Sequence, residues 1–546
     1  MGKRAQILIY FVIIIITFFT YFNSLQNEFI NYWDDNTYIT GNDLIKTLNF
    51  SNLKLIFSSF FFTEYYPINL LSYAIDYHFW GLNPLGYHIT NVFLHSLNAI
   101  LIFKIITTMV NRFSVASIAT IIFITLPVNV ETVVWVSERK NMLSFLFFLV
   151  SFYLYIKYQK NENRYYYLGS IITYIFAILS KSSVVMFPFI LFLYDFCFTK
   201  NRLQVKIINK IPFFIISIIA SIIVILGSEG SPAFEAYQVN LYPRLLTTLR
   251  IFAAYVEKVF IPINLNNFYV NYVSSSILGL EIIISILVLS IITFCAYKCY
   301  KQEIVIFFCI MWFFINLIPV SNIIPIPHWI ADRYLYFPSL AFSLLVATLF
   351  DKILKDATPS TISYKLKKIT SPLLIIILIF YSSLTILRNS VWKDSVTLWE
   401  NCVSKSPNSA LAHTYLGGSY MKKGCKDKAV IEFKKALQLN PRRANALANL
   451  AYIDIDNGLL DEAFKKIRLA LFYEEDNYEA HNALGVYYMS KAKYNRAIVE
   501  FQRALELRPE SIIDFHLIYN NLGLAYQKEG QTQHAALAFS HASTFR

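Results

Sequence analysis

The sequence is poor in charged residues, and this scarcity sets its class. Asp, Glu, Lys and Arg make up only 15% of the 546 residues, whereas hydrophobic residues make up 56%. Soluble domains carry charge at roughly a quarter of their positions. The composition therefore predicts a membrane protein. The net charge of +13 does not indicate nucleic-acid binding, because the basic residues are spread over many short loops.

Paired cysteines and nucleotide-binding motifs are lacking as well. The six cysteines form no CxxC pair, which argues against a zinc site and against a disulfide framework. The chain has no GxxxxGKS or GxxxxGKT, no GxGxxG after a predicted strand, and no HExxH. These absences argue against a nucleotide-driven pump and against a zinc protease.

Long apolar runs are present instead, and twelve of them are long enough, or nearly so, to cross a bilayer. They fall at 7–25, 89–110, 114–128, 142–158, 165–180, 182–198, 211–227, 246–262, 277–297, 304–320, 334–351 and 371–387. The first run follows MGKR and lacks a cleavage motif, so it is interpreted as an uncleaved signal anchor.

The run at 246–262 is the weakest of the twelve because it carries Glu257 and Lys258. A charge at bilayer depth costs about 2.5–3.5 kcal/mol, so this run is expected at the interface. Eleven spans with a cytoplasmic N-terminus then place most loop lysines and arginines on one side. The sequence thus predicts a multi-pass protein of the cytoplasmic (inner) membrane, with its C-terminal part outside.

A repeat with a period of 34 residues begins after Arg388. Its pattern is Leu416, Gly417, Tyr420, Ala429, Phe433, Ala436 and Pro441, which is typical of a tetratricopeptide repeat. About four copies follow a half repeat that contains Trp399. We therefore predict an all-α chain, with a polytopic membrane helix bundle at 1–390 and an α-solenoid at 391–546. Solenoids of this kind present a concave surface that binds peptides or proteins.

Acids and bases gather in and near the loops of the predicted outer face. They include Asp34, Asp35, Glu64, Tyr66, His88, His95, Glu131, Glu138, Arg139, Lys140, Lys181, Asp332, Arg333 and Tyr334. A transferase that uses a lipid-phosphate donor needs both kinds of group. A carboxylate takes the proton of the acceptor, and cations hold the departing phosphate.

Each of these groups has a simpler interpretation. Asp34 and Asp35 could form a solvated turn, or bind Mg²⁺ or Mn²⁺ as a carboxylate pair. Arg139 and Lys140 could be an interfacial pair at a helix start. The remaining groups have structural alternatives too: an ion pair between Asp332 and Arg333, interfacial placement of Tyr334, and helix packing for His88 and His95.

Several stretches together carry a resemblance to a known family. These are YWDDNTYI, YYPINLLSYAIDYHFWGLNPLGYHITNVFLHSLNA, ETVVWVSERKNMLS, LSKSSVVMFPFILFLYD and ADRYLYFPS, followed by the repeats. In this order they resemble the bacterial branch of the transmembrane and tetratricopeptide-repeat glycosyltransferases, which are similar to the protein O-mannosyltransferases of the GT-C superfamily. The resemblance covers essentially the whole chain.

The resemblance implies a membrane enzyme that takes a sugar, with mannose as one option, from a polyprenyl-phosphate donor. The acceptor would be a hydroxyl of a protein or glycan on the extracytoplasmic face, and the repeats would recruit it. Asp34 or Asp35 would be the general base. The family's basic groups map to Arg139, Lys140, Lys181 and Arg333, which would bind the donor phosphate.

Relatives often carry two histidines before the SERK motif, but this chain reads LPVNVE at 126–131. A role for histidine in that loop is therefore not expected. Two other functions stay open at this point: a non-catalytic membrane scaffold whose repeats bind an envelope protein, and a transporter for a lipid-linked sugar.

Overall fold

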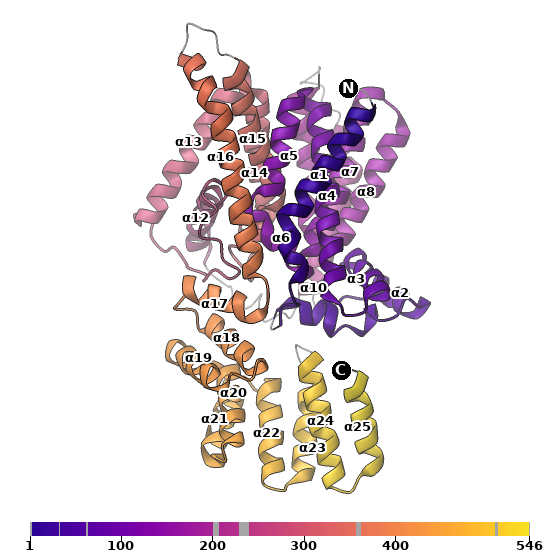
Figure 1. Cartoon of the computed structure of the whole chain (residues 1–546), viewed down its shortest axis with the longest axis vertical. Coiled ribbons are helices and arrows are strands. Elements are labelled where there is room, and N and C mark those ends of the chain that lie inside the picture. Colours follow the sequence, from indigo (N-terminus) through magenta and orange to yellow (C-terminus); the bar gives the residue numbers. More distant parts are fainter. Residues whose placement is uncertain are drawn as a thin grey trace. The chain divides into compact units, whose positions relative to one another are not determined.

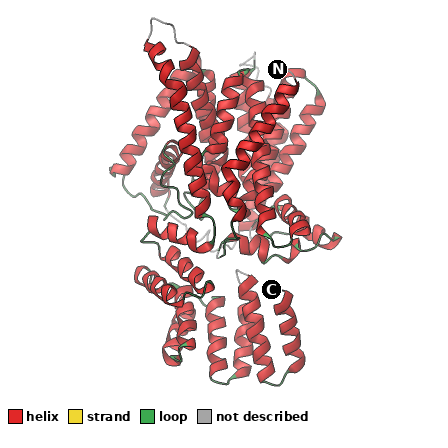
Figure 2. Ribbon diagram, in the orientation of Figure 1, coloured by secondary structure: helices red, strands yellow, loops and turns green. Residues whose placement is uncertain are grey.

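The computed structural model describes residues 3–31, 33–61, 64–199, 207–228, 240–355, 362–507 and 512–544. Within these ranges the chain is helical and contains no strand, so the all-α prediction is confirmed (Figure 2). The chain divides into two compact units. The membrane unit comprises Met1–Asn27 and Leu44–Ser390, and the repeat unit comprises Glu28–Asp43 and Val391–Arg546.

The membrane unit is built from helices joined by short loops and 3-10 turns (Figure 1). Its α-helices are α1 (Lys3–Tyr21), α2 (Phe50–Ser58), α3 (Pro67–Trp80), α4 (Pro84–Val110), α5 (Phe113–Thr125), α6 (Val130–Val134), α7 (Arg139–Asn161), α8 (Arg164–Ser180), α9 (Phe187–Phe198), α10 (Ile211–Ser228), α12 (Leu241–Phe260), α13 (Leu280–Gln302), α14 (Ile304–Leu317), α15 (Tyr336–Lys355) and α16 (Ile362–Val391). Its 3-10 turns are η1 (Phe22–Gln26), η4 (Pro127–Asn129), η5 (Val136–Glu138), η6 (Ser182–Met186), η7 (Ile207–Lys210), η8 (Ile318–Val320) and η9 (Asp332–Leu335).

The core of this unit lies where α4 packs against α5 and α7, and α5 packs against α15. Aromatic side chains fill it because these helices are apolar on every side. Phe145 and Phe337 have ring centroids 4.5 Å apart, and Trp312 meets Phe148 at 5.6 Å. The Trp312 indole N–H is not left unpaired, since it donates to the Phe337 carbonyl at 3.1 Å.

Seven helical segments of the described chain are long and apolar enough to cross a membrane. They are Gln6–Gln26, Pro84–Val110, Val136–Asn161, Ile207–Gly227, Leu280–Gln302, Asp332–Leu354 and Ser371–Val391. An eighth span would be the bent pair Phe113–Thr125 and Pro127–Val134, and Ser182–Phe198 and Ile304–Val320 are shorter apolar helices. The expected number of eleven spans is therefore not confirmed and stays a prediction. Helix α12 is not among the seven; it carries Arg244, Arg250, Glu257 and Lys258.

The repeat unit contains antiparallel helix pairs. Its helices are α17 (Ser395–Lys405), α18 (Ala410–Lys422), α19 (Lys426–Leu439), α20 (Ala444–Asp456), α21 (Leu460–Tyr473), α22 (Tyr478–Ser490), α23 (Tyr494–Glu506), α24 (Ile512–Lys528) and α25 (Thr532–Thr544). Side chains from Asp394, Ser409 and Asn477 cap the helices α17, α18 and α22 by accepting backbone N–H groups of the first turn.

A glycine in three of the four repeats, Gly417, Gly485 and Gly523, allows the two helices of a pair to approach. A Cβ at Gly417 would lie 2.6 Å from the Phe433 ring, and one at Gly485 would lie 2.4 Å from Phe501. In the second copy the equivalent position is Ala451, and the residue that replaces the phenylalanine is Ile467. The smaller isoleucine leaves room for the methyl group of alanine, so the exception obeys the same packing rule.

Residues 28–43 leave the membrane unit and pack with the repeats. The Trp33 ring lies 5.1 Å from Trp399 and 6.1 Å from Tyr415, while Trp399 and Tyr415 are 4.9 Å apart. The backbone N–H of Glu28 donates to the Lys393 carbonyl at 2.8 Å. This aromatic group and this hydrogen bond hold the segment that contains Asp34 and Asp35, including the π-helical turn η2 (Asn36–Thr40).

Candidate functional site

Short helical segments between α5 and α7 bring charged residues into the membrane unit. Helix α5 ends at Thr125, and Pro127 starts η4, so the chain bends by 54° instead of continuing as one helix. Three segments follow in quick succession, and they place Glu131 in α6 and Glu138 at the end of η5. Both carboxylates are buried, with exposed fractions of 1% and 2%.

Glu138 is the centre of a charged cluster, because three cations surround its carboxylate. Its Oε2 lies 3.3 Å from Lys181 Nζ, and its Oε1 lies 3.5 Å from Arg333 Nε and 3.8 Å from Lys140 Nζ. The side-chain amide of Asn141 also donates to Oε2 at 2.5 Å. These residues come from η5, α7, η9 and the loop before η6.

Arg333 joins the second buried carboxylate to this cluster. Its Nη1 donates to Glu131 Oε1 at 2.6 Å, and its backbone N–H donates to Oε2 at 3.3 Å. The guanidinium lies over the rings of Trp135 and Tyr334, with its Cζ 5.6 and 5.2 Å from the ring centroids. Carboxylates and aromatic faces therefore compensate this buried cation.

Lys140 connects the cluster to Glu64, which is the most exposed of its three carboxylates. The Lys140 Nζ to Glu64 Oε2 distance is 3.4 Å, and the Glu64 side chain is 33% exposed. Tyr66 donates to Glu64 Oε1 at 3.3 Å, and its ring lies 5.6 Å from the Lys140 ammonium. Burial, and then the charge of Glu64, raise the pKa of Tyr66, so its hydroxyl stays protonated as a donor.

Burial lowers the pKa of two further groups at this site. It lowers the pKa of Lys181, an effect that Glu138 opposes and that the charges of Lys140 and Arg333 increase. It also lowers the pKa of His328 to about 3, with Arg333 acting in the same direction, so this imidazole is neutral at neutral pH. Lys181 therefore gives up its proton more readily than an ordinary lysine.

Arg139 lies next to Lys140 in sequence but forms a separate group. Its Nη2 pairs with Asp76 Oδ2 at 2.5 Å and donates to the Tyr87 carbonyl at 3.1 Å. Its Nε donates to Asn91 Oδ1 at 2.8 Å, and its Nη1 donates to the Ser72 carbonyl at 3.3 Å. The guanidinium is fully buried and bonded to protein atoms on α3 and α4.

Asp332 also forms contacts apart from the Glu138 cluster. Tyr269 donates to its Oδ1 at 2.7 Å, and its Oδ2 lies 3.8 Å from Arg388 Nη2. The Lys258 ammonium lies 3.9 Å from the centre of the Tyr269 ring. Burial lowers the pKa of Lys258, and the charge of Asp332 opposes this. The adjacent residues Asp332 and Arg333 thus belong to two neighbouring polar groups.

The two predicted histidines lie inside α4 and bind other parts of the bundle. His88 Nε2 is 3.1 Å from the Asn27 carbonyl oxygen, and His95 Nδ1 is 2.8 Å from the Tyr336 hydroxyl. Both are buried. Their contacts fit the helix-packing alternative, while a substrate-binding role stays a prediction.

The acidic pair lies in the repeat unit, where its two members differ. Asp35 is 1% exposed, and its Oδ2 accepts the backbone N–H of Ile30 at 2.8 Å. Asp34 is only partly buried. Among the described residues no three His, Cys, Asp or Glu side chains are grouped so that they could hold a metal ion. A divalent cation bound by the carboxylate pair stays a prediction.

Sequence reasoning missed two members of these polar groups. Asp76 and Tyr269 were not singled out, although each contacts a predicted residue directly. Asp76 had a signal, because a carboxylate in the apolar run SYAIDYHFW needs a partner. Tyr269 had none, since only the fold brings it to Asp332.

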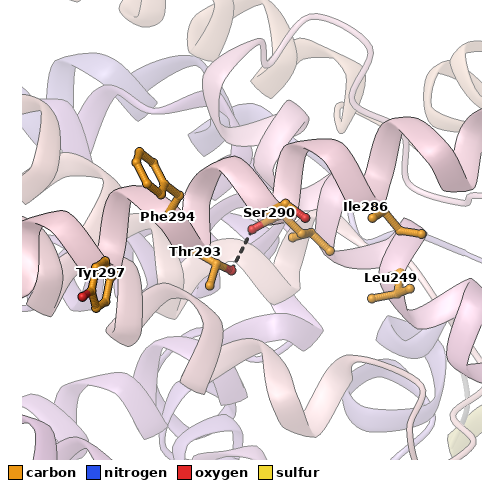
Figure 3. Close-up of a pocket in the computed structure, with 7 residues that line it drawn as sticks. Leu249, Ile286, Ser290, Thr293, Phe294 and Tyr297 are labelled. Carbon is orange, nitrogen blue, oxygen red and sulfur yellow. Dashed lines mark hydrogen bonds between the residues drawn. The ribbon is translucent and has the colours of Figure 1, made fainter.

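An apolar groove lies away from these polar groups, along α13 (Figure 3). It has a volume of about 710 Å³, and its lining includes Leu249, Ile286, Phe294 and Tyr297. The Thr293 hydroxyl in its wall donates to the Leu289 carbonyl at 2.8 Å, so its polar atom is satisfied within the helix. The groove has no charged lining residue.

The chain is similar to proteins named protein O-mannosyl-transferases. It is 24% identical to "Protein O-mannosyl-transferase F38B6.6" of Caenorhabditis elegans over 81% of this chain and 64% of the relative. It is 23% identical to human "Protein O-mannosyl-transferase TMTC3" over 79% of this chain and 51% of the relative. The chain thus spans about half to two thirds of the length of these curated relatives. The resemblance predicted from the sequence is confirmed.

The repeats are similar to known families and structures as well. The tetratricopeptide repeat family matches residues 410–443 and 478–511, which confirms the predicted repeat type. A crystal structure of MamA protein matches 28% of this chain and 80% of its own at 22% identity, with a TM-score of 0.21. That TM-score is too low to support a fold assignment by itself.

Proposed function

We propose that this protein is a membrane glycosyltransferase that moves a hexose, with mannose as the first candidate, from a polyprenyl-phosphate donor to a hydroxyl group. The acceptor is a protein or glycan on the extracytoplasmic face. The observation that carries the proposal is the Glu138 cluster, in which Lys140, Lys181 and Arg333 meet three carboxylates inside an apolar bundle. The names of the relatives agree with this activity.

A buried ionic cluster of this size is costly for a structure that only anchors other domains. Charges in membrane segments are rare and usually functional, because moving a charged side chain from water to the bilayer centre costs about 3 kcal/mol or more. Lys140 and Lys181 have ammonium groups that can turn from Glu138 toward an incoming phosphate. Arg333 can bind a phosphate oxygen with the guanidinium edge that faces Glu138.

Arg139 has a positioning role in this proposal. Its guanidinium is bonded to Asp76, Asn91 and Tyr87, so it fixes the start of α7 against α3 and α4. Lys140 follows directly, and its ammonium is aimed by that fixed start. Arg139 thus serves the donor phosphate through Lys140.

The reaction is a displacement at the anomeric carbon of the sugar. The acceptor oxygen forms a bond to this carbon as the bond to the phosphate oxygen breaks, and the phosphate leaves with the electron pair. A carboxylate takes the proton of the acceptor hydroxyl, and the configuration of the sugar inverts. We assign this base to Asp34, because Asp35 is buried and holds the Ile30 N–H.

The repeats recruit the acceptor in this proposal. Their helices form the tetratricopeptide type of solenoid, which uses an extended surface to bind peptides or proteins. The segment with the proposed base packs against the first repeat helices through Trp33. Acceptor binding and the base are therefore part of the same compact unit.

The test is transfer of labelled sugar from polyprenyl phosphomannose to envelope proteins by purified full-length protein. Asp34→Asn should reduce the turnover rate by about 10²–10⁴-fold, which is the usual loss of a general base. Asp35→Asn should mainly lower the unfolding temperature. Full transfer activity in both variants and in the double variant would reject a base at this pair.

The alternative of a non-catalytic scaffold predicts a different result for substitutions in the Glu138 cluster. A scaffold would still bind its envelope partner with Lys140→Gln and Lys181→Gln, and wild-type protein would transfer no sugar. Mass spectrometry of envelope glycoproteins with and without the gene separates the two functions.

A further inference from the structure

One side chain of α3, that of Asn69, is fully buried and has no hydrogen-bond partner among the described residues. Within the described chain, neither Nδ2 nor Oδ1 of Asn69 finds a donor or acceptor, and the residue is 0% exposed. A buried amide in this state weakens the fold, since it loses its hydrogen bonds to water and gains none. Such a group in a native protein requires an explanation.

The position of Asn69 on α3 shows what it faces. Residues three and four apart lie on the same side of a helix. Tyr66, three residues earlier, packs its ring against Lys140, and the side-chain hydroxyl of Ser72, three residues later, accepts from Arg139 at 3.4 Å. Tyr73, four residues later, lies 4.9 Å from the same guanidinium. Asn69 therefore faces the start of α7, between the contacts to Arg139 and Lys140.

A second unpartnered group lies in α6, the short helix that also carries Glu131. The Thr132 hydroxyl is 0% exposed and has no hydrogen-bond partner among the described residues. It directly follows Glu131, the carboxylate that pairs with Arg333. Asn69 and Thr132 thus both carry neutral polar groups that no described residue satisfies.

We infer that Asn69, with Thr132, binds hydroxyl groups of the sugar that the donor carries. An unused amide presents a donor and an acceptor, and a sugar hydroxyl can satisfy both at once. A phosphate oxygen can satisfy only the N–H donor and would leave Oδ1 unpaired. This inference rests on the proposed function, since it names the groups that read the sugar beside the cations assigned to the phosphate.

The experiment compares two probes, polyprenyl phosphate and polyprenyl phosphomannose, bound to full-length protein in lipid nanodiscs. Asn69→Leu and Thr132→Val keep the shape of each side chain and remove its hydrogen-bonding groups. We expect about a tenfold weaker affinity of Asn69→Leu for the sugar-bearing lipid, from one or two lost hydrogen bonds. Its affinity for the sugar-free lipid should be unchanged.

A stability measurement separates ligand binding from folding. Asn69→Leu should unfold at the wild-type temperature or higher, because it removes an unsatisfied buried amide. The matched control is Asn91→Leu, at an equally buried asparagine whose amide donates to the Val133 carbonyl at 3.1 Å and accepts from Arg139 at 2.8 Å. This control should unfold at a lower temperature. Asn69→Asp, which keeps the shape and removes the N–H donor, should show the same loss of sugar-dependent affinity.

Each other result would overturn the inference. If Asn69→Leu and Asn69→Asp bind both lipids like the wild type, the amide does not contact the sugar, and the proposed function stands without it. If the affinity of both variants falls equally for the two lipids, the amide binds the phosphate and not the sugar. If wild-type protein binds neither lipid, the proposed function fails together with the inference.

Discussion

The membrane unit and the repeat unit bury different kinds of side chain. In the membrane unit Glu138 and Arg139 are 2% and 0% exposed; three cations surround Glu138, and Arg139 pairs with Asp76. In the repeat unit the fully buried positions include Ala429, Phe433 and Ala436, and ion pairs such as Arg503 with Asp476 lie at the surface. Stability in the repeats depends on shape, whereas the membrane unit depends on charge balance as well.

This comparison indicates where function resides. A surface ion pair contributes little, about 0–1 kcal/mol, and can be lost without consequence. A buried ion pair often stabilises no more than apolar residues of the same size, so its retention needs another reason. For the Glu138 cluster, the proposed binding of the donor phosphate is the reason that buried charges are retained. The surface ion pairs of the repeats need no such explanation.

The largest effect is expected from a substitution that breaks the charge balance of the membrane unit. Arg333→Ala leaves Glu131 and Glu138 without a shared cation, and removal of one partner from a buried pair typically costs about 3–5 kcal/mol. We expect a much lower unfolding temperature and loss of sugar transfer. The control is Arg112→Ala, which breaks the pair with Asp351 at 3.0 Å, where the arginine side chain is 46% exposed. Equal unfolding temperatures for the two variants would contradict the comparison.

The next largest effect is expected from a substitution that disturbs side-chain packing in the repeat unit. Gly417→Ala places a methyl group 2.6 Å from the Phe433 ring, and overpacking of this kind costs about 1–3 kcal/mol. Hydrogen exchange of peptides from α18 and α19 should become faster. Gly417→Ala combined with Phe433→Ile, which copies the Ala451 and Ile467 pair, should restore part of the loss. No rescue by the second change would refute the packing rule.

A smaller effect of opposite sign is expected at the turn within the third repeat. Gly424, Gly458 and Gly530 have positive φ at this turn, and Ala492 takes the same place with φ of 53°. A residue with a Cβ is strained in this conformation by about 1–2 kcal/mol. Ala492→Gly should therefore raise the unfolding temperature of this repeat, as followed by hydrogen exchange of α22 and α23. A decrease in protection would show that the alanine is not strained.

The smallest effect at neutral pH concerns Lys181. Burial lowers the pKa of its ammonium, so the cation is lost on the alkaline side earlier than in an ordinary lysine. Sugar transfer should therefore decrease as the pH rises through this lowered pKa. Lys181→Arg stays charged at all accessible pH values and should move this decrease to higher pH. An unchanged alkaline limb would exclude Lys181 from phosphate binding.

Local patterns allowed much of the fold to be predicted. The repeats were visible in the sequence because Gly417, Ala429 and Phe433 recur at a fixed spacing, and the glycine and phenylalanine meet in the structure. The apolar runs marked the bundle helices. The span predicted at 114–128 has the wrong C-terminal boundary. Helix α5 ends at Thr125, and Pro127 begins the short turns that carry Glu131 and Glu138.

The partners within the site were harder to predict than its members. Lys140, Lys181, Arg333 and Glu138 were recognisable as charges in an apolar chain, and the fold brings them together. Sequence could not separate Arg139 from Lys140, since neighbours on a helix point about 100° apart and their environments depend on α3 and α4. It also gave no sign that residues 28–43 pack with the repeats, because Trp33 and Trp399 are 366 positions apart.

The placement of residues 28–43 affects how the protein can be dissected. The polypeptide passes between the two units three times, after Asn27, after Asp43 and after Ser390. A truncation that removes the repeats therefore also removes Trp399 and Tyr415 from Trp33, and releases the loop that holds the acidic pair. Loss of activity in such a truncation would report on the loop and the repeats at once. Point substitutions on the repeat surface, with Trp399 and Tyr415 left intact, are the cleaner way to assign acceptor recruitment.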